Sequence, residues 1–221
     1  MGKTALILGS TGLTGGWLLK LLLNDARYSE IRLFNRNSIE ISHPKITEYI
    51  VDLMDLESHK DTFEADEVFC CIGTTKTKTP DKELYTKIDY GIPVTASKLC
   101  KANKIKTFVV MSSLGANPKS SVFYNRTKGK MEDDVLKQDI ENTYIVQPSL
   151  IGGEREEKRI GESIGKILMK VIRPFLFGPL KKYRIIHPQT IAKAIISLAN
   201  ATPASGIYKS DVLKTWSNSW Q

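Results

Sequence analysis

The sequence predicts a doubly wound α/β fold, in which helices cover both faces of a parallel sheet. Short apolar runs rich in β-branched residues alternate with longer segments of helical periodicity, as is typical of parallel strands covered on both faces. The candidate strands are residues 4–8, 31–34, 46–51, 67–72, 107–111 and 143–147. The candidate helices between them are residues 13–24, 81–102 and 122–137, with a shorter helix or turn at residues 56–62. Repeated strand–helix–strand units favour right-handed crossovers and therefore a doubly wound sheet.

Composition and length favour a globular protein. The chain has 221 residues, of which 41% are apolar and 25% charged, and we expect residues 1–221 to form a single domain. No apolar run approaches the roughly 20 residues of a membrane-spanning helix, and the first apolar run is too short for a signal-peptide core. The three cysteines are odd in number and two are adjacent, which indicates buried, reduced thiols and a cytoplasmic location.

The formal charge of +8 is concentrated after residue 150. A basic segment can attract nucleic acid, an acidic membrane or a phosphate-bearing ligand, or can simply form a solvated face. No nucleic-acid recognition motif accompanies it, so we expect no nucleic-acid partner. His43, His59 and His187 lack metal-ligand spacing, so no metal is expected, and His187 before Pro188 is interpreted as a helix-entry residue.

The pattern changes after Pro148. Charged residues at 154–159 precede expected helices at 160–172 and 188–200, and we expect the segment 152–221 to include a small helical cap on the substrate side of the sheet. The apolar stretch 160–180 either roofs the substrate site, forms a homodimer or partner surface, or rests on a membrane interface. Trp216 and Trp220 belong either to a docking strip or to a disordered tail.

The strongest local signal is a glycine-rich loop between the first strand and the first helix. Gly9, Gly12 and Gly15 stand three residues apart, which suits a sharp turn, close approach of a pyrophosphate and packing of the helix on the strand. The helix amino terminus offers free N–H groups and a partial positive charge to phosphates. The loop therefore predicts a dinucleotide site, with Thr11, Leu13 and Thr14 as further contacts.

Arg36 favours NADP(H) over NAD(H) as the cofactor. NAD-binding proteins usually carry an acid at the end of the second strand for the ribose 2′-hydroxyl, whereas an arginine suits a 2′-phosphate. This strand ends in Asn35-Arg36-Asn37 without an acid. A guanidinium can hold a phosphate through two parallel hydrogen bonds, although a loop arginine can also simply face solvent.

Two further strand ends fit the same groove. Asp52, followed by Leu53, stands where it can accept a hydrogen bond from the adenine amino group or cap the next helix. Cys71-Ile72-Gly73-Thr74 ends the fourth run, where Gly73 lets the backbone pass close to a cofactor. Neither Cys70 nor Cys71 has a basic neighbour that would activate its thiol, so we interpret both as packing groups.

Ser113, Tyr124 and Lys128 form the candidate catalytic group. Tyr124 and Lys128 are four residues apart in a helical segment and therefore share a face. A lysine ammonium beside a phenol lowers the pKa of the phenol and makes it a proton donor near neutrality. The same lysine can bind the nicotinamide ribose, and a serine at the end of the fifth strand can hold a carbonyl oxygen.

In their order along the chain, these motifs resemble the atypical short-chain dehydrogenase/reductases. The glycine loop, Cys71 to Thr75, Ser112-Ser113 and Tyr124-x-x-x-Lys128-Gly129 are similar to those of the Tat-interactive-protein group of small oxidoreductases, and the resemblance covers roughly residues 4–200. Two positions depart from the family pattern. Asp89 or a neighbour stands where many relatives carry an asparagine, and Gln147 precedes Pro148 where an arginine is frequent.

The resemblance implies a seven-stranded Rossmann sheet that binds NADPH. It implies Tyr124 as proton donor, Lys128 as its partner and Ser113 as the residue that orients the carbonyl. It also implies that the backbone around Pro148, Leu150 and Ile151 lines the nicotinamide end. We therefore expect an NADPH-dependent reductase of a small carbonyl substrate, as a monomer or homodimer. The alternative is a non-catalytic regulator that senses NADP(H) and binds a partner.

Overall fold

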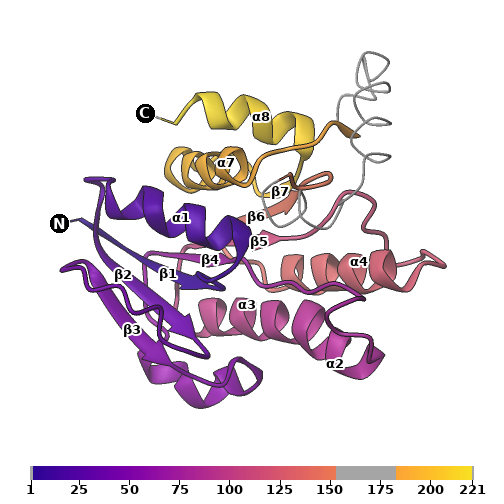
Figure 1. Ribbon diagram of the computed structural model, residues 1–221, viewed down its shortest axis with the longest axis horizontal. Coiled ribbons are helices and arrows are strands. Elements are labelled where there is room, and N and C mark those ends of the chain that lie inside the picture. The colour runs from indigo at the N-terminus through magenta and orange to yellow at the C-terminus, as the bar shows by residue number, and fades with distance from the viewer. Residues whose placement is uncertain (1, 153–182, 221) are drawn as a thin grey trace.

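Seven parallel strands form one sheet in the order β3-β2-β1-β4-β5-β6-β7 (Figure 1). The computed structural model describes residues 2–152 and 183–220. The strands are β1 (Lys3–Leu8), β2 (Tyr28–Asn35), β3 (Ile46–Ile50), β4 (Glu67–Cys70), β5 (Thr107–Met111), β6 (Asn142–Gln147) and β7 (Gly206–Lys209). All six neighbouring pairs are parallel. The predicted doubly wound Rossmann sheet is confirmed.

Helices cover both faces of the sheet (Figure 1). One layer contains α1 (Leu13–Leu23), α7 (Pro188–Ala201) and α8 (Ser210–Asn218), and α7 contacts both α1 and α8. The other layer contains the 3-10 helix η1 (Leu53–Thr62), α2 (Lys82–Thr86), the π-helical turn η2 (Lys87–Gly91), α3 (Ile92–Ala102) and α4 (Phe123–Leu136). As expected, Pro188 occupies the first turn of α7 and His187 is its N-cap residue.

The core consists of two clusters, one on each face of the sheet. Along β1, Ala5 and Ile7 belong to the cluster beneath α1 and α7, whereas Leu6 and Leu8 belong to the cluster above α3 and α4. Successive strand residues point to opposite faces. A strand buried on both faces must therefore be apolar at every position, and this explains the continuous run in the sequence.

The segment expected to be one helix, residues 81–102, is divided in two. A π-helical turn, η2, separates α2 from α3. Pro93 has no N–H to donate to the carbonyl of Asp89 four residues earlier, so the regular ladder cannot continue there. The turn places Asp89, whose side chain is fully buried, in the interior. Strand β4 also ends at Cys70, two residues earlier than expected.

The C-terminal residues complete the sheet and one helical layer. Strand β7 pairs with β6 and α8 packs on α7, although the sequence predicted neither element. The Trp216 ring meets Tyr208 edge-on with centroids 6.5 Å apart, and the Lys193 ammonium lies 4.8 Å from the centroid of the Trp220 ring. A disordered tail is therefore wrong for residues 206–220. The expected helix 160–172 and the apolar stretch 160–180 lie outside the described residues.

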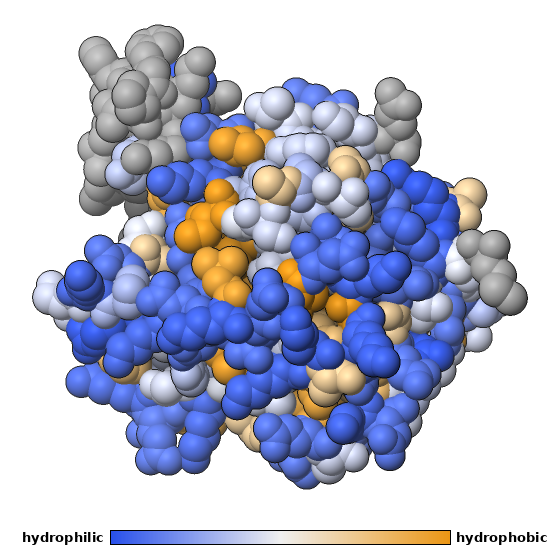
Figure 2. Space-filling view, turned by 180° about the vertical axis from the view of Figure 1, so that it is seen from behind, coloured by the Kyte–Doolittle hydropathy of each residue, from blue (hydrophilic) through white to orange (hydrophobic). Residues whose placement is uncertain are grey.

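The face opposite that of Figure 1 is largely hydrophilic, and its apolar side chains lie mostly near the middle of the view (Figure 2). Ile207 on the edge strand β7 is 45% exposed and Val212 on α8 is 40% exposed. Single exposed apolar residues are ordinary on protein surfaces. The expectation of a monomer or homodimer stays a prediction.

The register gathers the carboxyl ends of the strands at one edge of the sheet. Leu8 at the end of β1 lies opposite Phe34 on one side and Cys70 on the other. Strands β2 and β3 follow β1 on one side, and the chain then crosses to β4 on the other side of β1. The strand order therefore reverses between β1 and β4. In open parallel sheets a ligand crevice lies at this reversal, outside the carboxyl ends of the strands. The predicted site residues follow these ends.

Candidate cofactor-binding and catalytic site

The turn after β1 requires glycine for two physical reasons. Gly9 has φ = +88°, in the left-handed region that favours glycine. A Cβ at Gly15 would lie 2.1 Å from the carbonyl oxygen of Gly9, so α1 packs directly on the turn. The amide of Gly12 donates to the same carbonyl at 3.0 Å. The turn also approaches the end of β4, because a Cβ at Gly9 would lie 3.1 Å from the backbone of Cys71 and from the side chain of Ile72.

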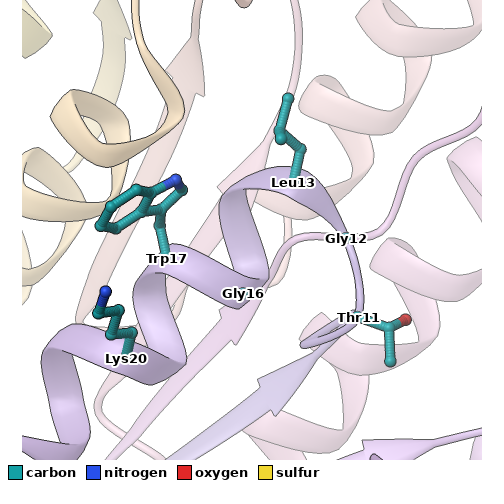
Figure 3. A pocket seen from close by; sticks show the side chains of 6 residues that line it. All are labelled: Thr11, Gly12, Leu13, Gly16, Trp17 and Lys20. Atoms are coloured by element: carbon teal, nitrogen blue, oxygen red, sulfur yellow. The ribbon is translucent and has the colours of Figure 1, made fainter. Parts of the chain in front are cut away.

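The amino terminus of α1 is open to an anion. Its N-cap residue, Gly12, provides no side-chain cap, and the first turn contains no acidic residue. Thr11 is exposed and Leu13 half-buried beside it, whereas Thr14 is buried. A hollow of about 290 Å³ begins at this turn and runs along α1. Figure 3 shows the residues that line it, Thr11, Gly12, Leu13, Gly16, Trp17 and Lys20. Uncapped N–H groups and the helix dipole suit a phosphate.

The residues expected at the adenosine end follow β2 and β3. Arg36 is exposed directly after β2. Asp52 accepts a hydrogen bond from the amide of Met54 at 2.9 Å, which is the capping role that the sequence allowed. A contact of Asp52 with adenine stays a prediction. The side chain of Leu53 belongs to the core, so a cofactor contact would depend on its backbone.

Lys128 and Asp89 form a buried ion pair below the end of β4. Their charged atoms lie 2.8 Å apart, and Lys128 also donates to the carbonyl of Met111 at 3.2 Å. The other Asp89 oxygen accepts from the amide of Thr74 at 2.7 Å. Asp89 therefore connects the Gly73–Thr74 backbone with the lysine expected to bind ribose.

The ion pair keeps Lys128 positively charged. Burial alone would lower the pKa of the Lys128 ammonium, but attraction to Asp89 outweighs it and raises the pKa above its ordinary value. A buried ammonium of this kind is a fixed donor. The sequence named Asp89 only as a departure from an asparagine and did not predict this pairing.

Tyr124 and Lys128 occupy successive turns of α4 but differ in exposure. The Tyr124 side chain is 37% exposed, whereas Lys128 is 3% exposed. The Tyr124 ring packs edge-on against Tyr85, with centroids 6.2 Å apart. Arg126 donates to the carbonyls of Ser120 and Ser121 and so holds the first turn of the helix to the preceding loop. The phenol thus faces outward above a buried cation.

Ser113 carries a buried hydroxyl that has no hydrogen-bond partner among the described residues. The hydroxyl of Tyr85 is in the same situation. Unsatisfied buried polar groups are rare in native proteins and call for a ligand, a water or a functional role. Ser113 lies two residues after Met111, whose carbonyl binds Lys128. A carbonyl oxygen or cofactor group at this place would satisfy its hydroxyl.

A buried polar network behind Lys128 was not predicted. Glu132, one turn beyond Lys128 on α4, accepts a hydrogen bond from the hydroxyl of Ser112. The side-chain amide of Gln147 donates to both Glu132 oxygens, at 2.9 and 3.1 Å. Burial raises the pKa of Glu132 above its ordinary value, against the opposing effect of these hydrogen bonds. The network joins the ends of β5 and β6 to α4. Its helical spacing from Lys128 is the one sequence signal that could have indicated Glu132.

The segment after β6 is fixed by backbone hydrogen bonds. The carbonyl of Pro148 accepts from the amide of Leu114 at 2.9 Å, and that of Leu150 accepts from Ile186 at 3.1 Å. Ile151 forms an isolated parallel bridge with Ile186. The Leu150 side chain is 45% exposed. These contacts hold the expected nicotinamide-end segment close to the loop that follows Ser113.

The cysteines are packing groups, as expected. All three thiols are free, and Cys70 and Cys100 are buried in the core. Burial raises the pKa of Cys70 to about 11. A thiol with a raised pKa is a poor nucleophile because little thiolate is present.

The fold and this arrangement define an NAD(P)H-binding protein of the atypical short-chain dehydrogenase/reductase group. Residues 9–169 match the family described as NAD(P)H-binding, and the chain belongs to that family. Protein FMP52, mitochondrial, of Meyerozyma guilliermondii is 37% identical over 202 residues, which are 88% of this chain and 84% of that protein. Protein HTATIP2 of Rattus norvegicus is 30% identical over 168 residues, 74% of this chain and 69% of that protein.

Solved structures support the fold. The Bordetella bronchiseptica enzyme WbmH in complex with NAD⁺ aligns with a TM-score of 0.70 at 15% identity, over 94% of this chain and 75% of that chain. UDP-N-acetylglucosamine 4-epimerase from Methanobrevibacter ruminantium aligns with a TM-score of 0.68 at 19% identity, over 94% and 76%. At these identities the similarity concerns the fold alone.

The expectation of a cytoplasmic protein is contradicted. Four similar proteins, from Scheffersomyces stipitis, Meyerozyma guilliermondii, Candida albicans and Debaryomyces hansenii, are named mitochondrial. Reduced thiols distinguish reducing from oxidising compartments, but they do not distinguish the cytosol from the interior of an organelle. Among residues 2–152 and 183–220, none of the helices has the length and apolar character needed to cross a bilayer.

Proposed function

We propose that this protein is an NADPH-dependent reductase of a small carbonyl compound. The observation that carries the proposal is the placement of three groups at the carboxyl edge of the sheet. The Tyr124 phenol is exposed, the Lys128 ammonium is buried on the same helix, and the buried Ser113 hydroxyl lacks a partner among the described residues. A purely binding protein requires the glycine turn but has no need of this group.

The proposed cofactor contacts divide along the crevice. The turn and first helical residues would hold the pyrophosphate, Arg36 the 2′-phosphate, and Asp52 with Leu53 the adenine. The pyrophosphate would contact Gly9, Thr11, Gly12, Leu13, Thr14 and Gly15. The nicotinamide half would contact Cys71, Ile72, Gly73, Thr74, Tyr124, Lys128, Pro148, Leu150 and Ile151. The uncapped amino terminus of α1 and the unpaired Ser113 hydroxyl fit such a ligand.

The residues of the chain would act on the oxygen of the substrate. When bound, the nicotinamide supplies a hydride to the carbonyl carbon. Ser113 donates a hydrogen bond that orients the carbonyl oxygen, and Tyr124 gives that oxygen a proton. Lys128, held by Asp89 at 2.8 Å, presents a fixed positive charge to the cofactor ribose and to the phenol. Its burial keeps this charge unscreened by solvent.

The test compares Tyr124→Phe with Tyr208→Phe in a screen of small aldehydes and ketones. NADPH binding is followed by tryptophan fluorescence, and turnover by loss of NADPH absorbance. We expect Tyr124→Phe to bind NADPH like the wild type and to lose turnover by about 100-fold or more, the contribution of a general acid. The Tyr208 hydroxyl donates a hydrogen bond to the carbonyl of Ala204, away from the proposed site. Tyr208→Phe should therefore retain turnover.

Two results would contradict the proposal. Unchanged turnover in Tyr124→Phe would exclude Tyr124 as the proton donor. NADPH binding without turnover of any carbonyl by the wild type would instead favour the non-catalytic alternative, a protein that senses NADP(H) and changes partners.

A further inference from the structure

One carboxylate holds both sides of the turn that carries Arg36. Glu48 on β3 accepts from the side-chain amide of Asn35 at 2.9 Å, on the N-terminal side of Arg36. It also accepts from the hydroxyl of Ser38 at 2.6 Å and from the amide of Ile39 at 3.0 Å, on the C-terminal side. The turn 35–39 is therefore closed through a side chain from the neighbouring strand.

The same network reaches the glycine turn. The hydroxyl of Ser10 lies 2.7 Å from the side-chain oxygen of Asn35. Ser10 and Asn35 are each only 3% exposed, so solvent does not compete for this contact. Ser10, Asn35 and Glu48 thus form a continuous chain of hydrogen bonds between the loop proposed for pyrophosphate and the turn proposed for the 2′-phosphate.

Arg36 is left available by this arrangement. It is exposed, and no hydrogen bond or ion pair joins its guanidinium to another of the described side chains. A flexible arginine loses conformational entropy when it binds, and a fixed backbone reduces that cost. The Glu48 contacts fix the backbone and leave the guanidinium free.

We propose that Glu48 is a positioning residue that sets the preference of the site for a 2′-phosphorylated adenosine. The inference rests on the proposed NADP(H) function and assigns the preference to Glu48 acting through Arg36. Glu48 itself would not touch the cofactor. Removing its carboxylate should therefore release the turn 35–39 and weaken binding only of ligands that carry the 2′-phosphate.

The charge of Glu48 is compatible with a phosphate nearby. An unpaired carboxylate would repel a phosphate and would accept a ribose 2′-hydroxyl, as in NAD-binding sites. Both Glu48 oxygens are instead engaged by three protein donors. Burial opposes ionisation, but these hydrogen bonds outweigh it and hold the pKa of Glu48 below its ordinary value. The carboxylate is therefore ionised near neutrality, and its oxygens are directed at the turn.

The experiment uses two fragments that differ by the 2′-phosphate, 2′,5′-ADP and 5′-AMP, and measures their dissociation constants by calorimetry. We compare the wild type with Glu48→Ala, Glu48→Gln and Arg36→Ala. Glu30→Gln is the matched control, because Glu30 is a carboxylate on the adjacent strand that binds Arg32 and Thr47, away from the turn. Circular dichroism and thermal unfolding check that each variant is folded.

We expect Glu48→Ala to bind 2′,5′-ADP about tenfold more weakly, a change of about 1.4 kcal/mol, with 5′-AMP nearly unchanged. Glu48→Gln retains one acceptor oxygen and should lose less. Glu30→Gln should match the wild type for both fragments. The loss in a double Glu48→Ala/Arg36→Ala variant should not exceed that of Arg36→Ala, since Glu48 acts through Arg36.

The outcomes separate the inference from the proposed function. If Arg36→Ala loses the preference for 2′,5′-ADP while Glu48→Ala retains it, NADP(H) use stands and the role of Glu48 is overturned. Equal weakening of both fragments by a folded Glu48→Ala would make the residue merely structural. A selective loss of 5′-AMP affinity would show direct ribose binding. A wild type without preference for 2′,5′-ADP would contradict both proposals.

Discussion

Lys128 and Asp89 form an ion pair in which the side chains are only 4% and 0% exposed, with their charged atoms 2.8 Å apart. Placing two ions in the interior is costly, and such a pair is a weak contributor to net stability. The π-helical turn that delivers Asp89 is itself an irregularity of a kind that is frequent at functional sites. Both features are consistent with a pair retained for the chemistry of the site.

Breaking this pair from one side should be strongly destabilising. We expect Lys128→Met to lower the free energy of unfolding by about 3–5 kcal/mol, because it leaves the Asp89 charge buried without a cation. The double variant Lys128→Met/Asp89→Asn should recover much of that loss, since asparagine is neutral and can still accept from Thr74. Urea unfolding of the wild type, Lys128→Met and the double variant measures the effect. A double variant as unstable as Lys128→Met would refute this explanation.

Gly15 and Gly16 form a matched pair for testing the turn. A Cβ at Gly15 would lie 2.1 Å from the oxygen of Gly9, whereas at Gly16 the nearest atom is 3.5 Å away. Gly15→Ala should therefore destabilise the protein by about 1–3 kcal/mol or more through overpacking and weaken NADPH binding. Gly16→Ala should be neutral or stabilise α1 by up to about 1 kcal/mol. Similar thermal unfolding of the two variants would contradict this geometry.

Arg36 should determine the cofactor preference. We expect Arg36→Ala to weaken NADPH about tenfold or more, because a charge-assisted hydrogen bond to phosphate contributes about 1.5–3 kcal/mol. NADH has no 2′-phosphate, so its affinity should change little. Fluorescence titration of both nucleotides gives the ratio directly. Arg32→Ala is a control, since Arg32 pairs with Glu30 on the same strand. An unchanged ratio in Arg36→Ala would remove the basis for NADPH.

Glu132 should make stability depend on pH in a defined direction. The folded protein holds the Glu132 proton more tightly than the unfolded chain, because burial raises the pKa above its ordinary value of 4.5. Its contribution to stability is therefore complete below pH 4.5 and is lost as the pH rises through the raised value. Relative to the wild type, Glu132→Gln should therefore gain stability as the pH rises above about 4.5.

Glu30→Gln provides a control of opposite sign. Burial acts on Glu30 as well, but its bonds to Arg32 outweigh it and lower the pKa. A depressed pKa gives stability that is present at higher pH and lost on acidification. Relative to the wild type, Glu30→Gln should thus become less stable as the pH rises. Urea unfolding at several pH values gives both trends, and parallel trends would contradict the assignments.

The sequence predicted elements whose local pattern carries their structure. Residues 5–8 of β1 are all apolar because both faces of the strand are buried there, and Pro188 marks the start of α7. Strand β7 has only four residues that alternate in exposure, and its Gly206-Ile207-Tyr208-Lys209 sequence has no distinctive signal. Its place in the sheet depends on pairing with β6, which lies far away in the chain.

The candidate site shows the same division. Gly9, Gly15 and Arg36 are recognisable because their roles follow from backbone conformation or position after a strand. Glu48 and Asp89 act through contacts across 13 and 39 residues of sequence, with Asn35 and Lys128 respectively. Such pairings arise only when strands and helices are assembled, so spacing along the chain cannot reveal them.

The packing of α7 on α1 has a consequence for how the protein is made. The apolar face of α1, which begins at the glycine turn, is covered by residues 188–201, synthesised more than 160 residues later. Closing so long a loop delays native contacts relative to local ones. During synthesis the apolar face of the first helix therefore stays uncovered by α7 until residues 188–201 have left the ribosome. Stable affinity for the dinucleotide should appear only after that point.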